Sequence, residues 1–130
     1  MFTLSTDFIS ISAQPEYIEY ESSPTEGIYV WVYHIKITNN GKHPVQLMNR
    51  YWHIVDGKGT VQEVRGPGVI GVQPIILSGE SYDYSSSVSL TTPTGIMHGE
   101  YEFKNNDDLV FHAQIPVFSL DSAEAIRLAN

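Results

Sequence analysis

The amino-acid sequence predicts an all-β protein, an antiparallel β-sandwich of the immunoglobulin or fibronectin type III kind with about seven to eight strands. Apolar and polar residues alternate with a period of two along most of the chain, as they do in strands with one buried face. Turn-forming residues interrupt this pattern at intervals of roughly eight to twelve residues. Before residue 121 no segment has the spacing of apolar residues that is typical of a helix.

The first half of the chain contains three extended regions. Residues 2–18 form a strand or a pair of strands, which we expect to be interrupted near Pro15. Turn residues at 21–27 lead into 27–40, whose two apolar faces predict a central, well-covered strand. Residues 45–56 form the next strand. The inward faces of these last two strands are expected to carry Tyr29, Trp31, Tyr33, Ile35 and Ile37, and Met48, Trp52 and Ile54, respectively.

The second half continues in shorter strands and ends in a hairpin. Glycines break the chain at 57–59. Three extended segments follow, at 60–64, 74–77 and 81–90. Residues 95–103 and 109–118 both alternate cleanly, and the Asn and Asp residues between them predict a hairpin turn. The inward set of this hairpin is expected to be Met97, Gly99, Tyr101 and Phe103, with Leu109, Phe111, Ala113, Ile115 and Val117.

The 130 residues are expected to form one domain, a sandwich at 1–120 followed by a short tail at 121–130. In the tail, Asp121 and Glu124 have the spacing of a capping box, but ten residues are too few for a stable isolated helix, so either one helical turn or a frayed end is expected there. The chain has no cysteine, which excludes disulfides and thiolate chemistry.

The charge and the hydropathy pattern limit the partners. Fifteen acidic and seven basic residues give a net charge of −8, which repels nucleic acid, so we expect no nucleic-acid partner. The N-terminus lacks the basic and apolar regions of a signal peptide, and no apolar stretch is long enough for membrane insertion. These features favour a cytoplasmic protein.

Gly66, Gly68 and Gly71 have the spacing G-x-G-x-x-G of dinucleotide-binding loops. Such a loop needs a helix directly behind it, because the helix N-terminus holds the pyrophosphate. Pro74 and the strand-like residues after it exclude a helix start at this point, so the glycines are expected to bend a loop between extended segments. The hypothesis that survives is a loop that binds phosphate or another anion. Its residues would be Arg65, Gly66, Gly68, Gly71 and Gln73.

Other polar residues give weaker signals. His112 is expected opposite Glu100 or Glu102 on the outer face of the last hairpin, as a solvated pair and not as metal ligands. Carboxylates at Asp83, Asp107 and Asp108 would attract a divalent cation such as Mg²⁺ only weakly. We predict no metal site, no cofactor and no catalytic residue, because the serines at 85–89 lack a nucleophile elbow and a triad.

A long pattern of residues runs from Trp52 to Phe103. It consists of Trp52, Ile54, Asp56, Gly59, Val64, Gly66, Gly68, Val69, Gly71, Gln73, Pro74, Gly79, Glu80, Tyr82, Tyr84, Leu90, Thr92, Pro93, Gly95, Met97, Gly99 and Tyr101. With YHIKITNNG upstream and IPVFSL downstream, this pattern resembles the ApaG domain family over nearly the whole chain. The resemblance implies a two-sheet sandwich in a small cytoplasmic protein associated with cobalt resistance and magnesium efflux. It also implies a protein-interaction role, as in eukaryotic domains of this kind, and it supplies no enzymatic activity that could be carried over to this chain.

The expected function is therefore that of a non-enzymatic accessory domain for protein–protein interaction, linked to Co²⁺ or Mg²⁺ tolerance by resemblance. The alternative is a phosphate- or nucleotide-binding protein that uses the Gly66–Gly71 loop. A third hypothesis is a hydrolase that acts on such a ligand. A homodimer through an edge strand is compatible with this fold, although Pro116 limits pairing along the last strand.

Overall fold

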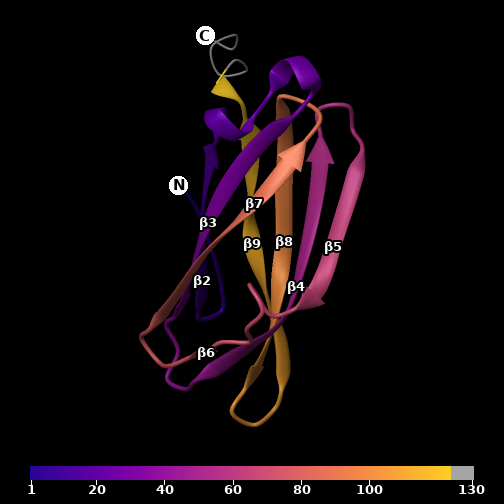
Figure 1. Ribbon diagram of the computed structural model, residues 1–130. Helices are drawn as coiled ribbons and strands as arrows, with labels where there is room; N and C mark the ends of the chain where they lie inside the picture. Colours follow the sequence, from indigo (N-terminus) through magenta and orange to yellow (C-terminus); the bar gives the residue numbers. More distant parts are fainter. Residues whose placement is uncertain (124–130) are drawn as a thin grey trace.

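The computed structural model describes residues 1–123, which fold as nine strands in two antiparallel sheets (Figure 1). The strands are β1 (Phe2–Thr6), β2 (Ile9–Tyr17), β3 (Tyr29–Asn39), β4 (Val45–Asp56), β5 (Val61–Pro67), β6 (Ile75–Ile76), β7 (Ser81–Leu90), β8 (Thr94–Asn105) and β9 (Val110–Asp121). Two short 3-10 turns, η1 (Glu19–Glu21) and η2 (Pro24–Glu26), lie between β2 and β3. One sheet has the order β1-β2-β3-β7, and the other has the order β5-β4-β8-β9 with β6 paired to β4. The predicted antiparallel sandwich is confirmed.

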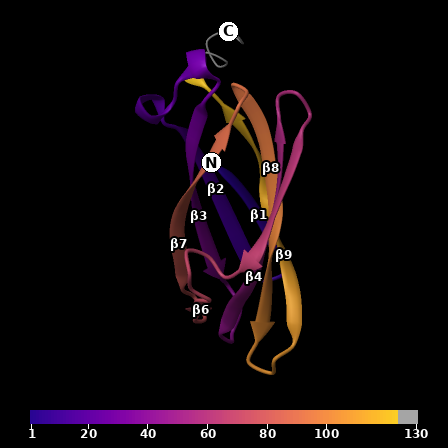
Figure 2. The same ribbon diagram turned by 45° about the vertical axis from the view of Figure 1, so that its right-hand side comes forward.

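The inward faces of the two sheets form one core, which lies between the two layers seen in Figure 2. Its largest side chains are aromatic, and Tyr33 contacts Trp52 across the layers with ring centroids 5.1 Å apart. Each fully buried side chain of this size contributes about 1.5–3 kcal/mol. The inward set predicted for β3 is confirmed, since all five of its members are buried.

One side of the sandwich is closed, because β1 and β2 pack against β9. The ring centroids of Phe2 and Phe118 lie 6.2 Å apart, and those of Phe8 and Phe111 lie 5.5 Å apart. At the opposite side β5 and β7 each have only one neighbouring strand within residues 1–123, so both are free edges. The sandwich therefore has a closed side and an open side.

A β-bulge in β4 changes the inward set that alternation predicts for this strand. The register with β8 shifts between Leu47 and Asn49. Leu47 is fully buried before the shift, whereas Trp52 is buried after it. The prediction that Met48 points inward is wrong, because a bulge inserts one residue that strict alternation does not anticipate.

A second bulge lies in the last hairpin. Met97 pairs with Phe118 but Gly99 pairs with Ile115, so β9 gains one residue between these pairs. Val117, which was expected inward, is therefore 61% exposed, and Phe118 takes the buried position. Leu109 was also expected inward but lies in the turn before β9 and is exposed.

Pro15 does not interrupt the first sheet, contrary to the prediction. It lies within β2 and pairs with Tyr33 of β3. On its other side β1 reaches only as far as Phe2, opposite Ala13, so Pro15 has a single neighbouring strand. The absent proline N–H therefore removes no ladder hydrogen bond on that side.

The last strand ends at Asp121, and the helical turn expected at 121–130 falls almost entirely outside the described residues. Across residues 1–123 no helix has the length and apolar character that a bilayer crossing requires.

Candidate functional site

The glycine loop connects β5 to β6 through a two-residue hairpin turn. Val69 and Val72 exchange two backbone hydrogen bonds, of 2.8 and 3.0 Å. Between them Ile70 and Gly71 have positive φ angles of 47° and 77°, as a type I′ turn requires. Pro74 and then β6 follow, so the chain stays extended and no helix begins after Gly71. The prediction of a bend between extended segments is confirmed.

A close backbone contact requires one of the motif glycines, Gly68, and a tight side-chain contact favours glycine at Gly66. A side chain at Gly66 would lie 3.0 Å from the guanidinium of Arg50, which crosses β5 at this point. At Gly68, φ is +58° and a Cβ would collide with the carbonyl oxygen of Val72. The third glycine, Gly71, has open space around it, and only its positive φ favours glycine. The fold itself thus accounts for the G-x-G-x-x-G spacing.

Ile70 is held in a conformation that disfavours its side chain. β-Branched residues rarely adopt positive φ, and the left-handed conformation costs an L residue about 1–2 kcal/mol. Asn, Asp or Gly is the usual residue at this turn position. The Ile70 side chain is 63% exposed, so little buried contact offsets the cost. Unexplained strain of this kind points to function.

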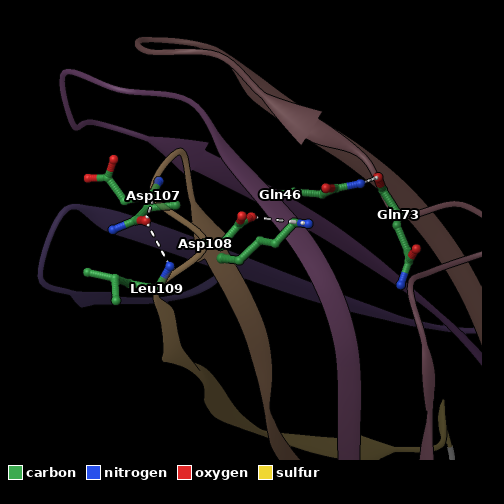
Figure 3. A network of polar contacts seen from close by, with 7 residues as sticks. Gln46, Gln73, Asp107, Asp108 and Leu109 are labelled. Carbon is green, nitrogen blue, oxygen red and sulfur yellow. Dashed lines mark hydrogen bonds and ion pairs between the residues drawn. The ribbon is translucent and has the colours of Figure 1, made fainter.

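Side-chain amides fasten the loop to β4. Gln73 donates from Nε2 to the backbone carbonyl of Met48 at 3.0 Å. The backbone carbonyl of Gln73 accepts from Gln46 Nε2 at 3.0 Å (Figure 3). The amide of Gly68 also donates to Met48, at 2.9 Å. Of the amides proposed for anion binding, that of Gly68 is therefore already engaged, and Gln73 acts as a tether.

Arg65 lies on the outer face of β5. Its guanidinium carbon is 4.2 Å from the centroid of the Tyr51 ring, and Nη2 is 3.4 Å from Glu63 Oε2. Side chains alternate along a strand, so Arg65 faces outward whereas Gly66 lies opposite the inward residue Arg50. Arg65 and Gly66 still line one outer groove of about 370 Å³ together. The other predicted residues shape the loop beyond that groove.

Arg50 is the functional candidate that the sequence reasoning missed. It is half-buried and points between the sheets, where Nη1 donates to the carbonyls of Pro67 at 3.0 Å and Gly68 at 3.1 Å. The alternation along the strand could have predicted its inward orientation, because Arg50 is separated from Trp52 and Ile54 by an even number of positions. An inward arginine in an otherwise apolar row was the signal.

Three phenols on the core side interact electrostatically with Arg50, those of Tyr33, Tyr84 and Tyr101. The hydroxyls of Tyr84 and Tyr101 are hydrogen-bonded to each other. Burial raises the pKa of Tyr33, Tyr84 and Tyr101, while the Arg50 charge acts in the opposite direction without prevailing. The phenols are therefore neutral at physiological pH, and none of them neutralises the guanidinium.

A cleft of about 390 Å³ lies next to Arg50 on the open side of the sandwich, between β5 and β7. Tyr33 and Trp52 lie at the cleft with Arg50, Val64 lines it from β5, and residues 86–89 line it from β7. The cleft therefore combines one cation with a row of serine residues, next to two aromatic side chains that are buried in the core.

The outer face of the five-stranded sheet carries the expected cross-strand pair. His112 Nε2 lies 3.3 Å from Glu102 Oε2, as the hairpin register predicted. Over the described residues, 1–123, no three His, Cys, Asp or Glu side chains are grouped so that they could hold a metal ion.

Comparisons with known proteins agree with this architecture. Residues 19–105 match the ApaG domain family. The chain is 47% identical to Protein ApaG of Agrobacterium fabrum and of Brucella canis, over the full length of both partners in each case. The crystal structure of an ApaA protein from Bordetella pertussis is similar with a TM-score of 0.86 and 40% identity, covering 88% of this chain and 94% of that one. An X-ray structure of a structural-genomics target has a TM-score of 0.84 and 38% identity, covering 89% and 88%. The chain belongs to the ApaG domain family.

Proposed function

We propose that this ApaG domain is a non-enzymatic accessory module that acts in the cytoplasm by binding a protein partner through its glycine loop. The observation that carries the proposal is Ile70, an exposed β-branched residue held at a φ of +47°. Strained backbone is retained mainly where function requires it. An aliphatic side chain presented in this way suits an apolar pocket on another protein.

Ile70 belongs to an apolar loop surface, which we define as Ile70, Val72, Ile75 and Leu77. These four residues fall within eight consecutive positions, and each of their side chains is at least 47% exposed. Clustered exposed aliphatic residues of this kind are typical of protein interfaces.

Charge near the loop indicates the chemistry of the partner. Ile75 lines a shallow depression of about 200 Å³ together with Lys104 and Asp108. Lys104 pairs with Asp108 at 3.5 Å, and Asp107 lies on the same turn (Figure 3). With a net charge of −8 on the chain, the best complement is an apolar surface with a basic rim.

The tethers of the loop reduce the cost of binding. The Gln73 side chain and the paired backbone of Val69 and Val72 fix the turn before any partner arrives. Little conformational entropy is then lost on association. The link to cobalt and magnesium tolerance that the family resemblance implies would operate through such a partner.

The experiment compares binding by loop variants. A partner obtained by cross-linking capture is purified, and its Kd is measured by calorimetry against the wild type, Ile70→Asn and Ile75→Ser. Burial of one aliphatic side chain contributes about 1.5–3 kcal/mol, so each variant should weaken binding by about tenfold or more.

Exposed aliphatic residues on the other face provide matched controls. Ile96 and Val117 are 48% and 61% exposed on the outer face of β8 and β9. Ile96→Ser and Val117→Ser should leave the Kd unchanged. Equal losses in both groups, or full binding by the loop variants, would contradict the proposal.

A second candidate function is phosphate or nucleotide binding, which is favoured by the groove that Arg65 and Gly66 share. A panel of nucleotides and phosphate would then stabilise the domain in thermal-shift assays and move the amide NMR signals of Gly66 and Gly68. Arg65→Gln should remove both effects. Unchanged signals at these glycines with every compound would exclude this candidate.

A further inference from the structure

β7 is an edge strand without the usual protection. Its ten residues contain no proline, glycine or lysine, and its only charge is Asp83. Natural edge strands are commonly protected by proline, lysine, bulges or covering segments. By contrast, the edge strand β5 ends in Gly66 and Pro67 and carries both Glu63 and Arg65.

The register shows which backbone groups of β7 face the free edge. Val30 of β3 lies opposite Ser89 but uses its own amide and carbonyl to bond the segment 18–22 on the other side of β3. Ser89 therefore turns its backbone groups away from β3. Because these directions alternate along an antiparallel strand, Ser85 and Ser87 do the same.

The inner face of β5 is incompletely covered. Gln62, Val64 and Gly66 point inward from β5, yet none of its residues is buried. Within residues 1–123 the four-stranded sheet has no strand beyond β7 that would cover β5. A further strand beside β7 would extend that sheet over this surface.

Arg50 gives the cleft between these strands a definite charge preference. Only its Nη1 is engaged, with two backbone carbonyls, and no ion pair of residues 1–123 includes it. It lines the cleft together with Ser86 and Ser87 of β7. A half-buried guanidinium without a carboxylate favours an anionic partner, and a carboxylate matches its planar donor geometry.

We propose that this cleft binds an extended segment of a partner protein, which adds a strand to the free edge of β7 and places a carboxylate side chain on Arg50. The main-chain bonds at Ser85, Ser87 and Ser89 would supply affinity, and the side chains that enter the cleft would supply specificity, as in other cases of strand addition. This inference rests on the proposed protein-binding function and adds a second surface with a defined ligand chemistry.

The cleft also predicts the spacing within the bound segment. Arg50 and Trp52 are separated by one residue on β4, so both face the cleft. The bound strand has the same period of two. Its acidic residue should therefore be separated by one position from an aliphatic residue that packs against Val64, the partly buried side chain of β5 at the cleft.

Selection from a display library of randomised twelve-residue peptides against the full chain tests the proposal. The expected result is enrichment of peptides that carry Asp or Glu one position removed from an aliphatic residue. A synthetic peptide of this type should shift the amide NMR signals of Ser85, Ser87 and Ser89. Replacement of its acid by Asn or Gln should weaken binding by about tenfold or more, since a charge-assisted bond is lost.

Two variants separate the backbone from the charge. Ser87→Pro removes an edge-facing N–H without removing a bond to β3, and should abolish peptide binding while the fold persists. Ser87→Ala is its control: it keeps this N–H and shortens only a side chain on the exposed face of β7, so it should bind normally. Arg50→Gln should remove the preference for the acidic residue. Because Arg50 also bonds the glycine loop, its unfolding curve is measured in parallel, and Ser87→Pro tests the site independently if that variant is unstable.

Several results would overturn the inference. These are a library without enrichment, enriched peptides without an acidic residue, and peptide binding by Ser87→Pro equal to that of Ser87→Ala. A dimer of the free chain with an interface at Ser85–Ser89 would also overturn it, because a second copy would then occupy the edge. Ile70→Asn distinguishes the two proposals. It should weaken binding of the protein partner to the apolar loop surface, and it should leave the selection of peptides unchanged.

Discussion

The closed and open sides of this sandwich differ in the kinds of side chain that they contain. On the closed side β1 and β2 pack against β9, and phenylalanine pairs such as Phe2 with Phe118 fill the join. On the open side, between β5 and β7, the residues at the cleft include serines, a glutamine and Arg50. The closed side supplies stability, and the open side presents backbone edges, a cation and the glycine loop. Apolar packing and exposed polar groups are thus separated across one small domain.

The largest expected effect comes from one truncation on each side of the sandwich. Phe118 is 1% exposed and contacts Trp52 with ring centroids 5.9 Å apart, so Phe118→Ala should cost about 3–5 kcal/mol. Val64, at the open side, is only partly buried, and Val64→Ala should cost less than about 1 kcal/mol. Urea unfolding of both variants measures the difference. Equal losses would show that the open side is as tightly packed as the closed side.

The glycines of the loop should differ from one another in a way that sharpens the contrast. Gly68→Ala combines a positive φ with a collision against Val72, and should destabilise the fold by more than about 2 kcal/mol. Gly71 has a φ of +77° but open space around it, so Gly71→Ala should cost about 1 kcal/mol. Unfolding midpoints at constant m-value provide the test. The reverse order would contradict the structural explanation of the motif.

The buried phenols predict a loss of stability in alkali. Burial raises the pKa of Tyr84 and Tyr101 above the ordinary value of 10.0. The unfolded chain therefore releases these protons first, so the stabilisation is complete below pH 10 and is lost as the pH rises toward the folded-state pKa values. The free energy of unfolding should fall by about 1.4 kcal/mol per pH unit for each tyrosine in this range.

Tyr84→Phe should reduce that slope in urea unfolding between about pH 9 and 11. Tyr20, which is 88% exposed, provides the control, and Tyr20→Phe should leave the slope unchanged. An identical slope in the wild type and Tyr84→Phe would show that this phenol does not keep its proton in the folded state.

Alternation was sufficient for the elements that follow it strictly. The five inward residues of β3 could be predicted, and the partner of His112 could be limited to Glu100 or Glu102, because each depends on a period of two within one strand or hairpin. The bulges in β4 and β9 could not, since an inserted residue reverses the faces and leaves no local signal. The predictions that Met48 and Val117 point inward were wrong for this reason.

The open side was less predictable than the closed side because it depends on contacts between distant strands. Gly66 lies against the guanidinium of Arg50, 16 positions earlier in the sequence, whereas the motif spacing alone suggests phosphate. The free edge of β7 follows from sheet order, which no local pattern specifies. Arg50 is the exception. Alternation along β4 predicts that its side chain points inward, but it does not predict that the guanidinium has no carboxylate partner.

The smallest expected effect concerns Ile70, where stability and recognition should move in opposite directions. Ile70→Asn places a residue that accepts positive φ at the first central position of the turn, so the free energy of unfolding should rise by about 1 kcal/mol. The same change removes the exposed aliphatic group that the partner is proposed to bind. Urea unfolding and calorimetric binding are measured on the same protein, with Val117→Asn as a control that lacks the turn geometry. A loss of stability in Ile70→Asn would show that the isoleucine contributes to folding, and the argument from strain to function would then fail.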